Sequence, residues 1–415
     1  MKSFNHIFDY LLETQQTDVL EYLKSIWKAE FEDDNLESNL TDNFFKDLLP
    51  KLKMSEQLQK ELKKGLSLFE DLPFLKPLLH LAKNQIENGG KIQYNKWPII
   101  DKDSHPYGNL LGSYLIINCI PDLINKYEQK KWPLEYCYDI LEDISLWLED
   151  HHSHNNIYHL KETGWISNHF AGNIFQIGRL QFEMRKDYNP FNGYVNKTNG
   201  TLALFVNDGQ TIRSDGQFNG TNNISDQNSF TTTFSQDREI LKGHLINPKG
   251  IVEKIISILK SSEWDHIIKE EANYLAVHIP ASGPITPDKI NLSFEEAIHF
   301  FEKSFPDFKF DYFGTKTWFM DNQLEQYLPG SNIVKWQQGV YLAPIPKADE
   351  KQCYERVFGS ENIDIHSIET TSSLQKVIQS HVQNGGHWRN SFFYLLKKDI
   401  PLKKNHYRKQ LEALK

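Results

Sequence analysis

The stretch YLAVHIPASGPITPDKINLSFEEAIHFF, residues 274–301, decides the fold of the second half of the chain. Its first part, 274–279, is an apolar run that predicts a strand, with His278 close to the carboxyl end. Glycine and proline in 281–284 predict a loop, and Ser293-Phe-Glu-Glu296 indicates a helix. A strand, a loop and a helix in this order predict an α/β arrangement.

Helices and strands continue to alternate on both sides of this unit. Strands are predicted at 175–184, 201–206, 308–318 and 340–345, and helices at 251–259, 321–328 and 372–383.

The first 160 residues have a different pattern, because their apolar positions recur at helical spacing. One stripe, opened by Pro133, runs through Leu134, Tyr138, Leu141, Ile144 and Leu148. The period changes near Trp165. We therefore predict an all-α domain at 1–164, followed by a mixed-sheet domain of α/β or α+β type at 165–415.

Composition excludes several classes of protein. The chain has 415 residues, enough for two or three domains, and its 46 Lys and Arg against 55 Asp and Glu give a net charge of −9. This charge repels nucleic-acid phosphates, so no nucleic-acid partner is expected. No apolar run reaches the length of a membrane span, and no secretion signal is seen at the N-terminus. Three cysteines without a C-x-x-C pair favour the cytoplasm.

The first candidate for chemistry is a polar face on the strand at 175–184. Arg179, Gln181 and Glu183 alternate with apolar residues, so they share one face. If this face lines a cleft, Glu183 is a candidate general base. If it meets water, the same residues form a solvated sheet face with an Arg–Glu pair.

The second candidate is the carboxyl end of the strand at 274–279. Ligands of α/β sheets bind at such ends, where loops and helix N-termini offer free N–H groups to anions. This position makes His278, Ser282 and Gly283 candidates, whereas the ordinary alternative for His278 is a structural hydrogen bond. Thr286 before Pro287 is typical of a helix N-cap.

Other histidines and common motifs carry less information. His151, His152 and His154 lack the i, i+4 spacing of a metal-binding helix, so no metal site is predicted. His169 precedes the Arg179 strand and is a secondary candidate for the same cleft. The sequence contains no G-x-S-x-G elbow, no P-loop and no dinucleotide fingerprint after a strand.

Four segments resemble a bacterial acyltransferase family that pairs a helical N-acyltransferase N-terminal domain with a GNAT-like C-terminal domain. They are 177–183, 278–287, 293–297 and 318–324. The resemblance extends over nearly the whole chain. It implies a mixed sheet of the GNAT kind, with an acyl-CoA lying across the unit at 274–305.

The resemblance also implies roles for individual residues. In a GNAT-type site an amine attacks the thioester directly while a base removes its proton. Glu183 is then the expected base, with His278 as its alternate. Arg179, Ser282 and Gly283 are expected to bind the coenzyme, and Gln181, His169 and Trp318 the substrate.

One departure from the GNAT pattern concerns the pyrophosphate cradle, usually Q/R-x-x-G-x-G/A. This loop has only Gly283, and Pro284 and Pro287 have no N–H to donate. Either Arg179 or a lysine helps to hold the pyrophosphate, or the fold serves a ligand other than the coenzyme.

The predicted function is therefore N-acyl transfer from acetyl-CoA or another acyl-CoA to a small amine acceptor. One alternative is a hydrolase that uses Glu183 with a second carboxylate such as Asp215. Another is a non-catalytic module that binds a small molecule or a protein on a degenerate GNAT fold. Tyr312 and Tyr327 lie where a general acid could be, although a core position suits either tyrosine.

Overall fold

The computed structural model describes residues 3–28 and 38–412. They form two compact units, Met1–Ile177 with Pro280–Ser282, and Gly178–Ile279 with Gly283–Lys415. Each unit is described by itself below.

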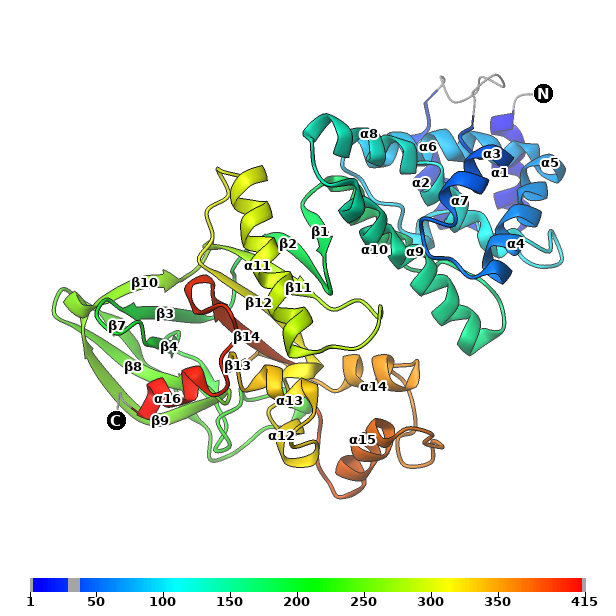
Figure 1. Cartoon of the computed structure of the whole chain (residues 1–415). Helices are drawn as coiled ribbons and strands as arrows, with labels where there is room; N and C mark the ends of the chain where they lie inside the picture. Colours follow the sequence, from blue (N-terminus) through cyan, green and yellow to red (C-terminus); the bar gives the residue numbers. More distant parts are fainter. Residues whose placement is uncertain (1–2, 29–37, 413–415) are drawn as a thin grey trace. The chain divides into compact units, whose positions relative to one another are not determined.

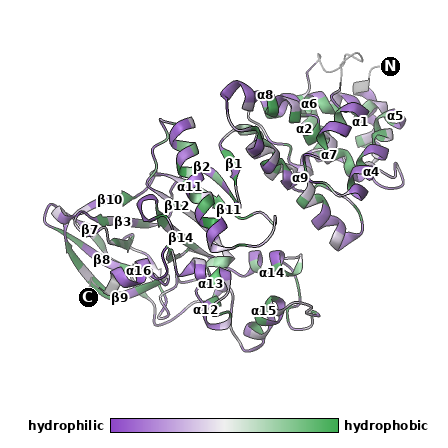
Figure 2. Ribbon diagram, viewed as in Figure 1, coloured by the Kyte–Doolittle hydropathy of each residue, from purple (hydrophilic) through white to green (hydrophobic). Residues whose placement is uncertain are grey.

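The first unit is helical (Figure 1). Its α-helices are α1 (Ser3–Glu13), α2 (Thr17–Ile26), α3 (Asp42–Leu48), α4 (Glu56–Lys64), α5 (Leu68–Asp71), α6 (Lys76–Glu87), α7 (Leu111–Ile117), α8 (Ile120–Lys130), α9 (Leu134–Asn155) and α10 (Thr163–Ala171). Hydrophobic and hydrophilic residues alternate along these helices (Figure 2), as expected for helices that bury one face. No helix in the described part of the chain is long and apolar enough for a membrane span.

The division between the units lies further along the chain than the predicted boundary. Residues 164 and 165 fall inside α10, and the strand β1 (Ile174–Ile177) still belongs to the first unit. Phe175 of β1 packs edge-on against Trp132, which anchors this strand among the helices. β1 is therefore a strand by its backbone that groups with the helical unit by its packing.

The second unit contains the mixed sheet predicted from the sequence. Its strands follow the order β2 (Leu180–Lys186), β11 (Asn273–His278), β12 (Tyr312–Thr317), β14 (Ser391–Leu396) and β13 (Tyr341–Pro344). Strands β11 and β12 are parallel and the other neighbours are antiparallel. The helix α11 (Pro287–Ser304) connects the two parallel strands, as a parallel pair requires.

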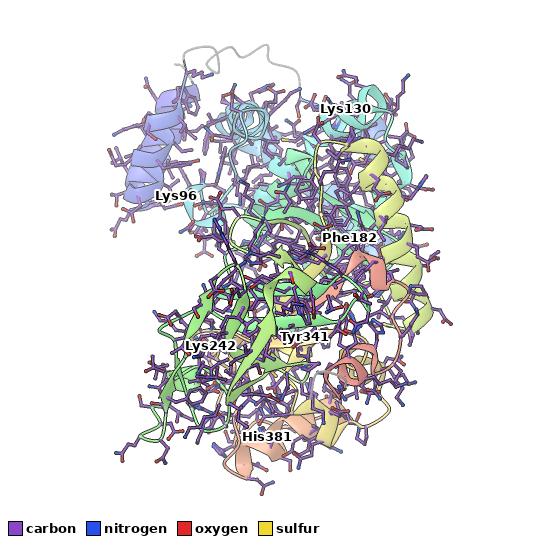
Figure 3. The ribbon with its side chains drawn as sticks, turned by 90° about the vertical axis from the view of Figure 1, so that its left-hand side faces the viewer. Lys96, Lys130, Phe182, Lys242, Tyr341 and His381 are labelled. Carbon is purple, nitrogen blue, oxygen red and sulfur yellow. The ribbon has the colours of Figure 1, made fainter. Side chains whose placement is uncertain are left out.

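Aromatic side chains hold α11 against this sheet. Phe182 of β2, labelled in Figure 3, makes edge contacts with Phe294 of α11 and Phe313 of β12. All three side chains are fully buried. The apolar face of β2 therefore points toward α11, and the polar face of the same strand points the other way.

A second, antiparallel sheet is built from the chain between β2 and β11. Its strands are β10 (Trp264–Ile268), β3 (Phe191–Asn196), β4 (Leu202–Val206), β8 (Ile240–Asn247) and β7 (Phe234–Gln236), with β9 (Ile251–Lys260) paired to β8. A short hairpin joins β5 (Thr211–Ile212) to β6 (Phe230–Thr231).

The helix predicted at 251–259 was wrong, because this segment is β9. Its isoleucines happen to recur near helical spacing, but β-branched residues favour a strand, and pairing along β8 decides the outcome. Ile255 and Ile258 remain 80% and 60% exposed. The apolar periodicity therefore did not report a buried helical face.

Short helices complete the second unit, and all of them except α16 contribute to a separate apolar cluster. They are α12 (Leu324–Tyr327), α13 (Asn332–Gln337), α14 (Lys351–Phe358), α15 (Ser373–Gln383) and α16 (His406–Glu412). The cluster contains Trp318, Leu324, Cys353 and Trp388.

Candidate active site

The register of β2 and β11 brings the two strongest candidate residues together. Gln181 lies opposite His278 and Glu183 lies opposite Ala276. Glu183 and His278 are therefore diagonal neighbours on one face, within reach of long side chains. The Oε2 atom of Glu183 lies 2.8 Å from Nε2 of His278, at hydrogen-bond distance.

The polar face of β2 is buried. Gln181 is 1% exposed and Glu183 is 9% exposed. The alternative of a solvated sheet face is therefore wrong. A buried carboxylate requires partners, because an unpaired charge away from water is costly.

Arg185 is the second partner of Glu183, and sequence reasoning missed it. Its Nε lies 2.8 Å from the same Oε2 atom that His278 contacts. The alternation that placed Arg179, Gln181 and Glu183 on one face extends to position 185, so the signal was present. The chain thus gives one carboxylate two nitrogen partners.

These partners decide the protonation state of Glu183. Burial alone raises the pKa of its carboxyl, but the hydrogen bonds and charges of His278 and Arg185 outweigh burial and bring the pKa below its usual value. Glu183 is therefore a stabilised carboxylate. A carboxylate held in this way accepts a substrate proton less readily, whereas the imidazole beside it retains a second ring nitrogen.

Arg179 connects the polar face to the loop and to α11. Its Nη2 donates to the carbonyl of Gly283 at 2.7 Å, and its backbone N–H donates to Oγ of Ser293 at 2.7 Å. Ser293 in turn donates to the carbonyl of Lys289. Ser293 therefore lies inside α11, in the helix that its sequence pattern indicated, and fixes the start of β2.

Gly178 permits this close contact. Its φ is +61°, and a Cβ built on it would lie 2.7 Å from Oγ of Ser293. An L-residue here would be strained and would also displace the serine hydroxyl.

The parallel strands β11 and β12 separate where the candidate residues lie. Their register contains only Leu275 opposite Phe313 and Ala276 opposite Gly314. Beyond these pairs β11 continues along β2 as far as His278, while β12 continues along β14. The carboxyl ends of two parallel strands thus diverge beside the loop that leads to α11, a position at which α/β folds bind ligands.

The start of α11 differs in part from the expected cap. Thr286 occupies the N-cap position, but its side chain accepts no cap hydrogen bond, and Pro287 opens the helix. A proline there removes a donor that would have no partner within the helix. The N–H groups of the first turn that remain still favour an anion at this end.

The loop contains two of the three residues expected to bind the coenzyme. Ser282 is half-buried, and Gly283 is exposed with φ of +115° and open space around a virtual Cβ. Together with Arg179, Gln181, Glu183 and His278, Gly283 belongs to the second unit, whereas Ser282 groups with the first.

Two predicted substrate-binding residues lie on elements other than β2 and β11. His169 lies on α10, is fully buried, and has Nε2 3.0 Å from Oδ2 of Asp143, which also accepts from Trp165. Trp318 is 5% exposed and belongs to the apolar cluster around Leu324. Both side chains are held by the packing of their own unit, and their roles in substrate binding stay predictions.

The residues named for alternative chemistries also have structural partners. Asp215 pairs with Arg213, and Tyr312 donates to Asp187 at 2.9 Å. Tyr327 lies 2.8 Å from Nδ1 of His381. These pairs explain the positions of all three residues without a role at Glu183. In the part of the chain that the structure describes, no group of His, Cys, Asp and Glu has the arrangement of a metal site.

Several solved structures have a similar fold. An acyltransferase in complex with decanoyl-CoA is 17% identical, with a TM-score of 0.61 over 93% of this chain and 99% of that one. An acyltransferase with decanoyl-CoA and teicoplanin is 17% identical, with a TM-score of 0.62 over 91% and 94%. One with CoA and 10C-teicoplanin is 15% identical, with a TM-score of 0.61 over 91% and 99%. A search of curated proteins gave no match.

Two family descriptions match adjoining parts of the chain. The N-acyltransferase N-terminal domain matches residues 43–172, and the GNAT-like C-terminal domain matches residues 174–393. With more than half of its length in the second match, the chain belongs to the family that carries a GNAT-like C-terminal domain, here preceded by an N-acyltransferase N-terminal domain.

Proposed function

We propose that the protein transfers an acyl group from acyl-CoA to an amine of a small-molecule acceptor. The observation that carries this proposal is the hydrogen-bonded pair of the buried Glu183 and the half-buried His278, at the diverging ends of β11 and β12. Two acyltransferase structures of the same fold contain decanoyl-CoA, one of them with teicoplanin, and a third contains CoA with 10C-teicoplanin.

The residues around the loop suit a phosphate-bearing co-substrate in part. The first turn of α11 supplies N–H groups, and the Arg179 guanidinium already reaches the loop at Gly283. Pro284 and Pro287 offer no N–H, so this chain has fewer backbone donors than the usual GNAT cradle. We therefore assign to Arg179 the binding of the pyrophosphate, in place of the missing backbone donors.

In this proposal His278 is the general base and Glu183 is its positioning residue. This reverses the order of the two residues expected from the sequence. With Nε2 directed at Glu183, Nδ1 is the imidazole nitrogen that takes up the amine proton in this proposal. The amine nitrogen bonds to the thioester carbonyl carbon, the carbon–sulfur bond breaks, and His278 accepts the amine proton, which returns to the departing thiolate.

Glu183 contributes to this step without touching the substrate. Its carboxylate fixes the imidazole orientation and stabilises the positive charge that develops on His278 when it takes the proton. Arg185 keeps the carboxylate charged, because its own charge lowers the pKa of Glu183. The three residues thus act as one unit on the face of β2 and β11.

The test is release of free thiol from decanoyl-CoA and acetyl-CoA in the presence of a panel of primary amines. We expect His278→Gln to lower kcat by about 100-fold or more, the usual contribution of a general base. We expect Glu183→Gln to lower kcat by about 10- to 100-fold, with the pH profile of kcat displaced. Glu183→Asp should recover part of the loss.

Matched controls separate chemistry from folding. His299→Gln, at an exposed position of α11, and Lys186→Gln, at an exposed position of β2, should both keep wild-type turnover. Turnover within twofold of wild type in His278→Gln would refute the assignment of the base. Hydrolysis without any amine acceptor that is lost in both Glu183→Gln and Asp215→Asn would favour a hydrolase instead.

A further inference from the structure

A polar pocket in the helical unit has the features of a ligand site separate from Glu183 and His278. Its volume is about 350 Å³, and it lies between α4, the loop before α7, and the chain that follows α9. This volume is within the range of small-molecule sites. All its lining residues belong to the helical unit.

The walls of this pocket are aromatic and are held in place. His152 and Tyr158 stack with their centroids 4.2 Å apart and their planes at 12°. Tyr107 also lines the pocket, and its N–H donates to Nδ1 of His105, whose Nε2 lies 3.0 Å from Asp71. The pocket walls are therefore already ordered before a ligand binds, and binding loses little side-chain entropy.

Three amide side chains line the same pocket: Gln57, Asn109 and Asn156. Among the described residues, none of these amide groups has a hydrogen-bond partner, whereas other amides of the unit, such as Gln59, do. Each amide offers both a carbonyl acceptor and N–H donors. Three such amides can hydrogen-bond to the hydroxyl groups of a ligand, because a hydroxyl group also both donates and accepts.

The charges at the pocket oppose each other. Glu61 and Lys102 both line it, one acidic and one basic. A pocket for phosphate would require an excess of positive charge, and a pocket for an amine would require an excess of negative charge. This balance favours a neutral ligand.

We propose that this pocket binds a neutral hydroxylated ring of the monosaccharide class. The apolar face of such a ring suits the aromatic walls, and its hydroxyls suit Gln57, Asn109 and Asn156. The site does not depend on the proposed transferase activity, because none of its residues belongs to the Glu183 and His278 pair.

The experiment is saturation-transfer difference NMR of the full chain with N-acetyl-D-glucosamine and D-glucose. We expect saturation transfer to the ring protons, and affinity lowered about tenfold in Gln57→Ala/Asn109→Ala. Gln57 is exposed on α4, so Gln57→Ala alone should fold even if the double variant unfolds. This single variant should also weaken sugar binding, but less than the double variant does. Glu56→Ala, exposed on the same helix and outside the lining, is the matched control and should bind as wild type.

Other outcomes would overturn the proposal. These are no saturation transfer to either sugar, unchanged binding in the amide variants, or tighter binding of inorganic phosphate or of a blocked alanine dipeptide than of the sugars. His278→Gln should bind the sugars as wild type does, which makes a failure here distinguishable from a failure of the proposed function.

Discussion

The Oε2 atom of Glu183 lies 2.8 Å from Nε2 of His278, although the two residues are 95 positions apart in the chain. Arg185 contacts the same oxygen at 2.8 Å. The carboxylate therefore carries two partners, and its charge depends on both.

The stability contributed by Glu183 should decrease in acid. Its folded pKa is lower than its usual 4.5 despite burial, because His278 and Arg185 favour the charged form. The contribution is therefore complete above the unfolded pKa and is lost as pH falls through the folded pKa. Urea unfolding should show Glu183→Gln destabilised by about 1–3 kcal/mol at pH 7. This deficit should shrink below about pH 4.5.

Glu271→Gln is the control for this prediction, because Glu271 is 65% exposed. Its effect should be small at every pH. A deficit for Glu183→Gln that grows as pH falls would contradict the assigned protonation state.

Replacement of Gly178 should be more costly than replacement of another glycine with positive φ. Gly178→Ala combines a left-handed backbone with a Cβ 2.7 Å from Oγ of Ser293, whereas Gly209→Ala has φ of +76° and nothing within 4 Å. We expect about 1–2 kcal/mol for Gly209→Ala from backbone strain alone. Gly178→Ala should lose about 1–3 kcal/mol more from the clash. Equal unfolding free energies for the two variants would show that the Ser293 contact relaxes freely.

Two tyrosines share one buried carboxylate at the end of β2. Tyr312 and Tyr394 donate to Oδ2 of Asp187 at 2.9 and 3.2 Å. Each Tyr→Phe change should cost about 1–2 kcal/mol. The double variant should cost about 0.5–1 kcal/mol more than the sum, because the remaining hydroxyl compensates in each single variant. Tyr188→Phe, 67% exposed, should change the unfolding free energy little, and strict additivity would argue against a shared network.

His159 should make the protein less stable in mild acid. Burial, followed by the charges of His151 and Lys161, lowers the pKa of His159 from 6.5 to about 4. The unfolded chain therefore binds more protons between these values, and stability rises with pH across the window. Because His159 is partly exposed, solvent screening reduces this effect. His159→Gln should therefore remove about 1 kcal/mol of the change in unfolding free energy between pH 4.5 and 7. Thermal unfolding of both proteins at pH 4.5 and 7 measures it, and an identical pH dependence would refute the shifted pKa.

The residues of the candidate site could be predicted in part because their signals are local. Alternation along 179–185 follows from the pleat of a strand, and an apolar run followed by a Gly-Pro loop and a helix predicts β11 and α11. The same local reasoning was misleading at β9, where isoleucines near helical spacing form a strand because β8 pairs with them. Trp318, whose substrate role was implied by the family resemblance and stays a prediction, packs in the apolar cluster with Leu324 and Trp388.

The sequence by itself determined a helical first part, a mixed sheet in the second, and one strand face that carries Arg179, Gln181 and Glu183. Periodicity encodes these features within a few residues. Only the tertiary structure decided that Glu183 contacts His278, that Ser293 fixes Arg179, and that β11 diverges from β12. The two hydrogen bonds join segments far apart in the chain, and the two diverging strands are also distant in sequence. Their geometry depends on strand register and helix packing, which no local pattern specifies.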